Sequence, residues 1–322
     1  MFCNIYFGSI EQYLLKDVFD KDSSHIIRGG SLSKDFDVMF VQSKHDLHLL
    51  VRIVDDFLLI STCKVTTNRF LQKLNKGIPR LGVKINGDKS RVNYPLSLEN
   101  TVTGEMEAVG VCEKFFPWCG LLINTTTCEI SLDHGRFTGS QAIDTVIIHR
   151  GENEGVHLKK KMKDFVRPRC SQKLLFSSCI NGIDTIRMNF YQTFVICAIK
   201  LVHYLSGSGI SSLGGHQQFI YISACDTIHF AFLLISSKLK HGNVRTVSSY
   251  TNDDMRSFQL AWKDALWLGR HAFYSVFQRS GKQYAQLGKL FSESQRVTNP
   301  NNLLAVTRQA LKIWSLHSRK VG

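Results

Sequence analysis

The chain has 322 residues, of which 43% are hydrophobic and 20% charged, a balance that excludes a disordered or fibrous protein and allows two ordinary domains. Lys and Arg number 40 against 26 Asp and Glu, which gives a formal net charge of +14. Such an excess favours a polyanionic partner, either nucleic acid or an anionic membrane face.

The cysteines predict a reduced, intracellular setting. They number nine and form no CxxC pair, and the first residues lack the basic start and the cleavage site of a signal peptide. The longest apolar stretch, residues 219–235, carries Asp226 and His229 near its middle. A membrane-spanning helix needs roughly 20 residues without such groups, so this stretch predicts a core helix of a soluble protein and no membrane partner.

The first half of the chain mixes helix and strand patterns. Apolar residues at helical spacing alternate with short runs of β-branched and aliphatic residues. The expected elements, in chain order, are a helix over 2–19, strands over 37–42 and 48–62 with a break at Asp55–Asp56, a helix over 66–78, a strand over 82–86, and a hairpin over 115–130 with its turn around Asn124 to Thr126. Together they predict an α+β unit over residues 1–150.

The second half reads as long helices. Helical periodicity covers residues 183–206, 216–240, 255–280 and 301–317. We therefore expect an all-α domain over residues 151–322.

The positive charge is concentrated in two segments of this second half. Lys159 to Lys173 holds seven Lys and Arg against one acid, and Arg256 to Gly322 holds eleven against two. Aromatic residues lie among the basic ones, as in many nucleic-acid binders, although at helical spacing most of them are expected to be core. Solvated helix faces usually mix both signs, so a nucleic-acid surface is favoured over a merely solvated one.

The sharpest local signal is Val54-Asp55-Asp56 between two apolar strands. Adjacent carboxylates in a buried turn repel each other and lose solvation, and a cation relieves both effects. Mg²⁺ suits such a pair because it takes carboxylate oxygens together with substrate phosphates. A surface turn is the alternative, but it would not need the apolar runs LLVRIV and FLLI on its two sides.

Residues 82–90, GVKINGDKS, come close to a phosphate-binding P-loop. Asp88 stands before Lys89 and would face the phosphates, so the P-loop is rejected. Lys89 stays of interest as a cation on a turn. Cys112, Cys119 and Cys128 lack a fourth zinc ligand at the usual spacing and are expected to be buried thiols.

Taken in order, these segments resemble one family. VRIVDDFLLIST is similar to motif C of reverse transcriptases, and LVRIVDDFLL is close to its form in telomerase reverse transcriptases. GVKINGDKSRVN resembles motif D, whose lysine falls on Lys89, and FFPWCGLLINTTTCEI resembles motif E, the primer grip. HLKKKMKDFVRPRC and KLLFSSCINGIDTIRMNF resemble the telomerase thumb. The resemblance covers essentially the whole chain.

The resemblance implies a partial reverse-transcriptase palm followed by a thumb. Residues 1–150 would hold the tail of motif B and motifs C, D and E, as antiparallel hairpins with helices, and residues 151–322 would form the helical thumb. The family's RNA-binding domain, its fingers motifs and motif A, with the third catalytic aspartate, have no counterpart in these residues. We therefore expect the chain by itself to be inactive.

The implied function is that of the C-terminal portion of a telomerase catalytic subunit, an RNA-directed DNA polymerase. Such an enzyme adds telomeric repeats to chromosome 3′ ends by a two-metal nucleotidyl transfer with Mg²⁺. The implied partners are the telomerase RNA template, the single-stranded telomeric primer, the RNA–DNA duplex and deoxynucleoside triphosphates. The implied location is the nucleus, at the telomeric region of chromosomes.

Specific roles are also carried over by resemblance. Asp55 and Asp56 would be catalytic metal ligands, and Lys89 would be the catalytic cation near the triphosphate and a proton donor to pyrophosphate. The remaining site residues are the primer grip, Trp118, Cys119 and Gly120, and the nucleic-acid contacts of the thumb, Arg169, Lys173, Asn181 and Gly182.

Two other interpretations stay open. A palm without motif A cannot close its metal site, so the chain could be a non-catalytic nucleic-acid-binding module from a truncated reverse transcriptase. A mobile-element reverse transcriptase is the third alternative.

Overall fold

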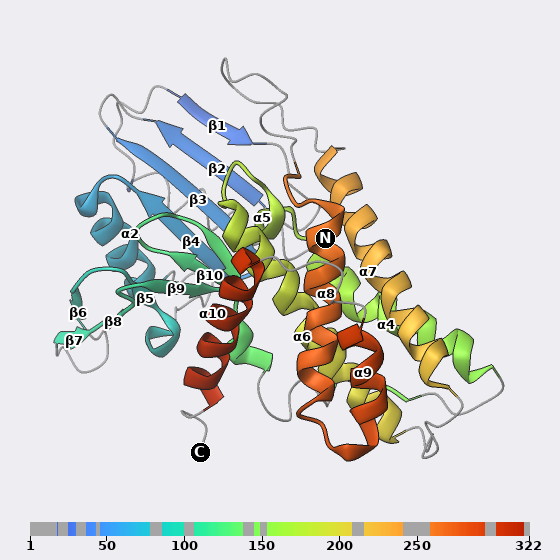
Figure 1. Cartoon of the computed structure of the whole chain (residues 1–322). Helices are drawn as coiled ribbons and strands as arrows, with labels where there is room; N and C mark the ends of the chain where they lie inside the picture. Colours follow the sequence, from blue (N-terminus) through green and yellow to red (C-terminus); the bar gives the residue numbers. More distant parts are fainter. Residues whose placement is uncertain are drawn as a thin grey trace. The chain divides into compact units, whose positions relative to one another are not determined.

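The structure is a computed structural model that describes residues 18, 25–29, 37–42, 46–77, 86–99, 106–137, 145–148, 153–207, 216–240, 258–293 and 301–318. The expected helix over 2–19, apart from Val18, and nearly all of the expected strand over 82–86 lie outside these residues. The described elements mix antiparallel sheets with helices (Figure 1), so the predicted α+β class is confirmed.

The chain divides into two compact units. The first comprises residues 1–119, 123–127 and 243–249, and the second comprises residues 120–122, 128–242 and 250–322. The division falls before the predicted boundary at residue 150. The reason is that the residues after 128 pack with the helices of the second unit, as the hydrogen bonds of Asn181 and Asn189 described below show.

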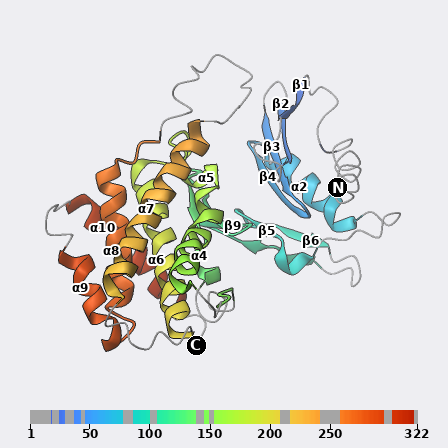
Figure 2. The same cartoon turned by 90° about the vertical axis from the view of Figure 1, so that its right-hand side faces the viewer.

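The first unit is built on a four-stranded antiparallel sheet. Its strands lie in chain order and are β1 (His25–Gly29), β2 (Asp37–Gln42), β3 (Leu47–Ile53) and β4 (Asp56–Ser61). Alternate residues of β3 are buried, which gives the sheet one buried face. Helix α2 (Lys64–Lys76) packs beside β4 with Phe70 and Leu74 buried (Figure 2). The strands over 37–42 and 48–62 and the helix over 66–78 are thus confirmed.

Four short strands and a 3₁₀ turn complete the first unit. They are the 3₁₀ helix Gly87–Lys89 and the strands β5 (Arg91–Val92), β6 (Ser97–Glu99), β7 (Met106–Ala108) and β8 (Gly110–Val111). β5 pairs with β8 in parallel and β6 pairs with β7 in antiparallel orientation. Val92, Leu98 and Val109 form their small buried core.

Residues 115–132 form a three-stranded sheet in the order β11-β10-β9. Its strands are β9 (Phe115–Trp118), β10 (Leu121–Asn124) and β11 (Ile130–Leu132). The predicted turn after Asn124 is present. A second turn at Cys119–Gly120 divides the first predicted strand, because both residues adopt left-handed backbone angles, with φ 48° and 79°.

The second unit consists mainly of helices. In chain order they are α4 (Glu154–Cys170), α5 (Lys173–Phe176), α6 (Ile183–Gly207), α7 (Gln217–Lys240), α8 (Trp262–Phe277), α9 (Ala285–Glu293) and α10 (Asn301–Ser318). The four predicted helical stretches are confirmed, although α8 begins later than expected. The sequence patterns predict neither α4, which contains Pro168, nor α9.

The core of this unit surrounds α6, which packs against α4, α8 and α10. Phe190, Tyr191 and Phe194 of α6 have no exposed surface. In the same unit, Phe273 of α8 stacks on Phe291 of α9, with the two ring centroids 5.3 Å apart. Burying one such side chain stabilises a fold by about 1.5–3 kcal/mol, so this aromatic layer dominates the stability of the unit.

Helix α7 packs one face against α4, α8 and α9. By length and composition alone it is apolar enough to cross a membrane, a weak indication because core helices pass the same test. Of its most apolar 18-residue stretch, 39% is buried. Ile222 and Leu233 remain exposed. The predicted core helix is therefore a helix with one buried face.

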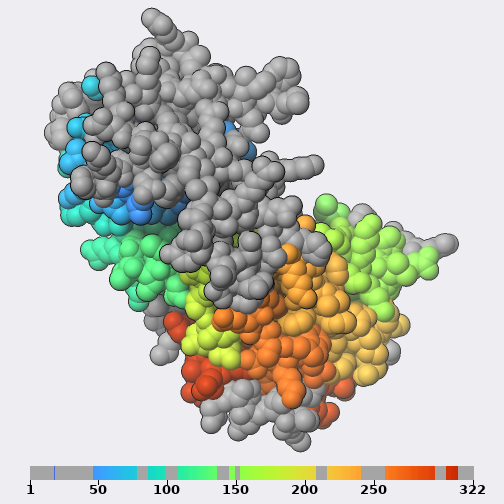
Figure 3. Space-filling model, turned by 90° about the horizontal axis from the view of Figure 1, so that it is seen from above, coloured from blue at the N-terminus to red at the C-terminus, as the bar shows by residue number. Residues whose placement is uncertain are grey.

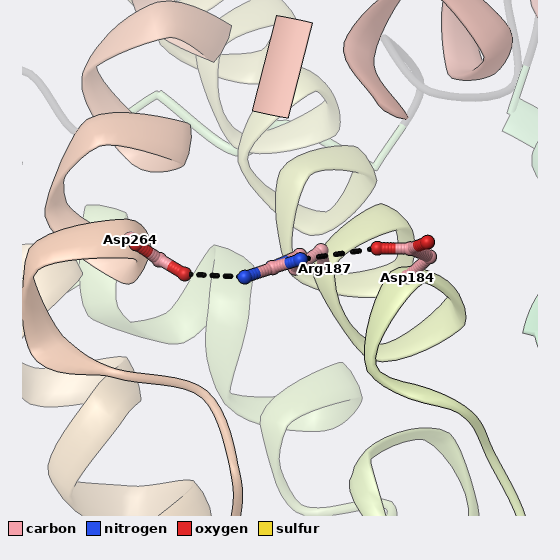
Figure 4. Close-up of polar contacts among 3 residues, drawn as sticks. All are labelled: Asp184, Arg187 and Asp264. Carbon is pink, nitrogen blue, oxygen red and sulfur yellow. Dashed lines mark hydrogen bonds and ion pairs between the residues drawn. The ribbon is translucent and has the colours of Figure 1, made fainter. Parts of the chain in front are cut away.

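An ionic bridge joins α6 to α8. Arg187 donates to Asp264 at 2.8 Å and to Asp184, one turn away on its own helix, at 3.1 Å (Figure 4). Partial burial lowers the pKa of Arg187, but the two carboxylates outweigh burial and raise the pKa above its ordinary value. The bridge fixes the start of α6 on the start of α8.

Candidate functional site

The predicted carboxylates lie on a tight turn between β3 and β4. Ile53 pairs with Asp56, so only Val54 and Asp55 connect the two strands. Val54 has φ 55°, an unusual angle for a β-branched residue, and its carbonyl accepts a hydrogen bond from Nη1 of the buried Arg52 at 2.9 Å. Asp55 and Asp56 are both exposed, which corrects the expectation of a buried acid pair.

A second turn meets this one. The Sγ atom of Cys119, between β9 and β10, lies 3.3 Å from Oδ2 of Asp56 and donates a hydrogen bond to it. Asp56 and Cys119 are 63 residues apart in sequence. The structure therefore brings together one residue of the predicted metal site and one of the predicted primer grip.

The neighbouring Trp118 is buried, with 8% of its surface exposed. Within the described part of the chain, its indole Nε1–H has no hydrogen-bond partner. A buried donor without a partner costs about 1–3 kcal/mol and usually has a functional reason.

Lys89 stands on a separate turn. It ends the 3₁₀ helix, which Asn86 caps by accepting a hydrogen bond from the Asp88 backbone N–H at 3.0 Å. The Lys89 side chain is exposed. Among the residues that the structure describes, no hydrogen bond or ion pair links it to Asp55 or Asp56. The structure thus places Lys89 in the same unit as the acids without bringing them into contact.

In the helical unit, Asn181 is 2% exposed. Its Oδ1 accepts from the Ile130 backbone N–H and its Nδ2 donates to the Leu174 carbonyl, both at 2.7 Å. The next residue, Gly182, donates its backbone N–H to Oε1 of Glu129 at 2.7 Å. Both predicted contact residues thus fasten the loop before α6 to the end of the β10–β11 hairpin.

Asn189 is a residue that sequence reasoning missed. It is fully buried, its Oδ1 accepts from the Leu132 N–H at 3.1 Å, and its Nδ2 donates to the carbonyls of Ile130 and Leu175 at 2.9 Å each. With Asn181 it forms the asparagine pair that ties β11 to the helices. Its signal in the sequence is an amide side chain within a mostly apolar helical stretch.

Arg169 lies in the interior of the helical unit, 7% exposed, and its Nη1 donates to the Phe165 carbonyl at 3.2 Å. Burial lowers its pKa. Burial and the charge of Arg169 also lower the pKa of Lys200, which is 9% exposed. Lys173, the first residue of α5, is partly exposed. The two basic residues predicted to contact nucleic acid are therefore in different environments.

The other cations of α4 fall into two groups. Lys159, Lys163 and Arg167 face α7: Lys159 pairs with Asp226 at 3.8 Å, and the other two lie 5.5 and 5.0 Å from the centre of the Phe230 ring. We call these three the α7-facing row. α4 and α7 lie side by side in Figure 3. Among the described residues, no ion pair or ring contact engages Lys160 or Lys161, so both are available to phosphates.

The acids of the hairpin fit a magnesium ion as part of a larger site. No group of three or more His, Cys, Asp and Glu that could hold a metal occurs among the described residues. Mg²⁺, however, commonly uses one or two carboxylates and completes its shell with water and substrate phosphates. Two exposed carboxylates on one turn meet that requirement.

Comparison with known proteins finds telomerase reverse transcriptases. The chain is 26% identical over 289 residues to a telomerase reverse transcriptase of Oryza sativa subsp. japonica and 25% identical over 289 residues to that of Arabidopsis thaliana, covering 88% and 89% of its own length. It is 32% identical over 153 residues, 47% of its length, to the telomerase reverse transcriptase of Canis lupus familiaris. No protein-family model matches the chain.

All three relatives are telomerase reverse transcriptases. Over most of its length the chain is similar to these telomerase reverse transcriptases, and the resemblance drawn from its motifs is confirmed. The chain spans 21% and 24% of the two plant relatives and 13% of the canine one, about a quarter of their length or less.

Proposed function

We propose that the chain forms the late palm and the thumb of a telomerase catalytic subunit, residues 1–150 and 151–322, and that it takes part in RNA-templated addition of telomeric repeats to chromosome 3′ ends. The observation that carries this proposal is the contact between Asp56 and Cys119. It joins the hairpin that resembles motif C to the turn that resembles motif E. A polymerase needs these two parts together, because one carries the acids and the other guides the primer end.

In this proposal Asp55 and Asp56 hold Mg²⁺, Asp55 as the main ligand and Asp56 nearer the primer end. When bound in a two-metal site, the cations stabilise charge on the attacking and leaving oxygens. Exposure of both carboxylates keeps them accessible to nucleotide and metal. Lys89 supplies a positive charge toward the triphosphate and donates a proton to pyrophosphate, for which its exposed ammonium is suited.

Trp118, Cys119 and Gly120 guide the primer. Trp118 is 8% exposed and directly precedes the Cys119–Gly120 turn, so its burial anchors that turn. The left-handed backbone angles of Cys119 and Gly120 let the chain reverse direction tightly between β9 and β10.

The helical unit holds the RNA–DNA duplex by contacts to phosphate. Lys160 is exposed and Lys161 and Lys173 are partly exposed, so these three cations are accessible to phosphate. Asn181 and Gly182 shape the loop that approaches the duplex, and Arg169 lies at the buried end of α4. The remaining partners are the telomerase RNA, the single-stranded primer and deoxynucleoside triphosphates, and the setting is the telomeric region of nuclear chromosomes.

Primer extension tests the catalytic part of the proposal. A complete catalytic subunit that contains these residues should extend a primer on its RNA template, and Asp55→Ala should abolish nucleotide addition while primer binding changes little. The loss then lies in the rate and not in affinity, as expected for an interaction made in the transition state. Asp46→Ala, which changes another carboxylate of the same sheet region, is the matched control and should retain extension.

Duplex binding by the chain as it stands separates the alternatives. If about six phosphates are contacted, raising salt from roughly 50 to 200 mM should weaken binding on the order of 10³-fold. Binding without extension by the complete subunit would favour a non-catalytic binding module. Absence of duplex binding at low salt would contradict the proposed thumb.

A further inference from the structure

Two strained turns meet at one carboxylate. Val54 precedes the acids with φ 55°, and Cys119 stands between β9 and β10 with φ 48°. Neither is a glycine, so both residues adopt an angle that L-amino acids with a side chain rarely take. Such angles persist only where surrounding contacts enforce them, and they concentrate at functional sites.

The contacts around Asp56 come from both turns. Within its own hairpin, the buried guanidinium of Arg52 holds the Val54 carbonyl at 2.9 Å and so fixes the turn before the acid. From the other turn, the Cys119 thiol donates to Oδ2 of Asp56 at 3.3 Å. The second contact reaches the carboxylate itself. An exposed aspartate without such a contact samples several orientations.

We propose that Cys119 is a positioning residue for Asp56. Its thiol holds Oδ2 and thereby leaves Oδ1 in a fixed direction, available to a divalent cation. This inference rests on the proposed function, because it assigns Cys119 a role toward the carboxylate in addition to its predicted place in the primer grip. Groups that orient a metal ligand by hydrogen bonding typically change metal affinity by 10–100-fold when removed.

A thiol suits this role for an electrostatic reason. It is a neutral, weak donor, so it orients the carboxylate without cancelling the negative charge that attracts the cation. A lysine or arginine at the same place would form an ion pair with Asp56 and compete with the cation. Serine keeps a neutral donor at this position, whereas alanine removes the donor.

The geometry can be tested in the chain as it stands, without any activity. Asp56→Cys should form a disulfide with Cys119 under mild oxidation, detected as a linked peptide pair by mass spectrometry. Asp55→Cys is the matched control, because its side chain has no contact with Cys119 among the described residues. Rapid linkage for Asp56→Cys and slow linkage for Asp55→Cys would support the contact. Equal linkage, or none, would overturn it.

The role can be tested in a complete catalytic subunit by varying Mg²⁺ during single-nucleotide addition. Cys119→Ala should raise the Mg²⁺ concentration at half-maximal rate by about tenfold or more, and Cys119→Ser should restore most of the difference. Cys112→Ala is the control, since it removes a partly buried thiol of the same unit. It should leave the Mg²⁺ dependence unchanged.

The outcomes distinguish this inference from the proposed function. Cys119→Ala could slow nucleotide addition without changing its Mg²⁺ dependence. That result would overturn the positioning role of Cys119, but it would not contradict the proposed polymerase function. A subunit that extends primers equally well with Asp55→Ala would refute the proposed function. The disulfide experiment would still decide whether Cys119 and Asp56 meet.

Discussion

The two units of this chain differ in where their important side chains lie. In the first, the residues assigned to chemistry, Asp55, Asp56 and Lys89, are exposed on turns. In the second, the residues that define the structure, such as Tyr191 and Phe194, have no exposed surface. Packing therefore controls the helical unit, whereas a few polar contacts control the chemistry-bearing turns. Substitutions in the first unit should change rates, and those in the second should change stability.

The largest effect expected from one further side chain concerns Lys89. Lys89→Leu in a complete subunit should slow nucleotide addition by roughly 10²–10⁴-fold, the usual loss on removing a general acid. Lys89→Arg should recover part of the charge effect but little of the proton donation. Neither variant should change thermal stability, because the side chain is exposed. If Lys89→Leu left the rate of nucleotide addition unchanged, Lys89 would have no catalytic role and would be an ordinary solvated lysine.

The next effect is on stability and concerns the asparagine pair. Asn189→Leu should lower the free energy of unfolding by about 3 kcal/mol or more, because three buried backbone groups lose their partner. Asn124→Leu is the control, as its Oδ1 accepts from Thr126 and Thr127 in an exposed turn. Its loss should stay below about 1 kcal/mol. Equal losses in chemical denaturation would contradict the role of Asn189 in tying β11 to the helices.

A smaller effect is expected from pH. Burial lowers the pKa of His271 to about 4, from 6.5 in the unfolded chain. As the pH falls, His271 is therefore protonated in the unfolded chain before it is protonated in the folded one. The stability contributed by neutral His271 is complete above pH 6.5 and is lost as the pH falls toward 4. Between pH 7.5 and 5, the parent should lose about 2 kcal/mol more than His271→Gln in the free energy of unfolding. Parallel pH profiles would show that His271 titrates normally.

The smallest effect concerns phosphate contacts on α4. Lys160→Gln with Lys161→Gln should remove about two contacts, so the weakening of duplex binding between roughly 50 and 200 mM salt should shrink by about tenfold. Lys163→Gln with Arg167→Gln is the control, because these side chains of the α7-facing row lie over Phe230. The comparison is made by titrating a labelled RNA–DNA duplex. An equal change of slope would mean that both faces of the helix contact phosphate.

Much of the fold follows from the sequence, and the reasons for the failures are physical. The β3–β4 hairpin was predictable because apolar runs stop on both sides of Asp55–Asp56. The exposure of Asp55 and Asp56 was not predictable, because the burial of a side chain depends on elements far away in sequence. The predicted strand is divided at Cys119–Gly120 because both residues have positive φ angles. Only Gly120 is of a residue type that indicates such an angle in the sequence, and Cys119 is not.

The burial of residues in the candidate site could not be predicted from local sequence either. Charge counts identified Lys159 to Lys173 as a basic segment, but they could not distinguish Arg169, which points into the core, from Lys160, which is exposed. That distinction depends on helical phase, and Pro168 conceals the helix in the sequence. The contact of Cys119 with Asp56 joins residues 63 positions apart, which no local pattern reveals.

The separation of chemistry from duplex binding is the central claim, and one paired measurement tests it most directly. In a complete subunit, the rate of nucleotide addition at saturating duplex and the duplex Kd are measured together for Asp55→Ala and for Lys160→Gln with Lys161→Gln. The account predicts a crossed result: Asp55→Ala loses the rate and keeps the Kd, while the lysine pair weakens the Kd and keeps the rate. Variants in which rate and affinity fall together would contradict it.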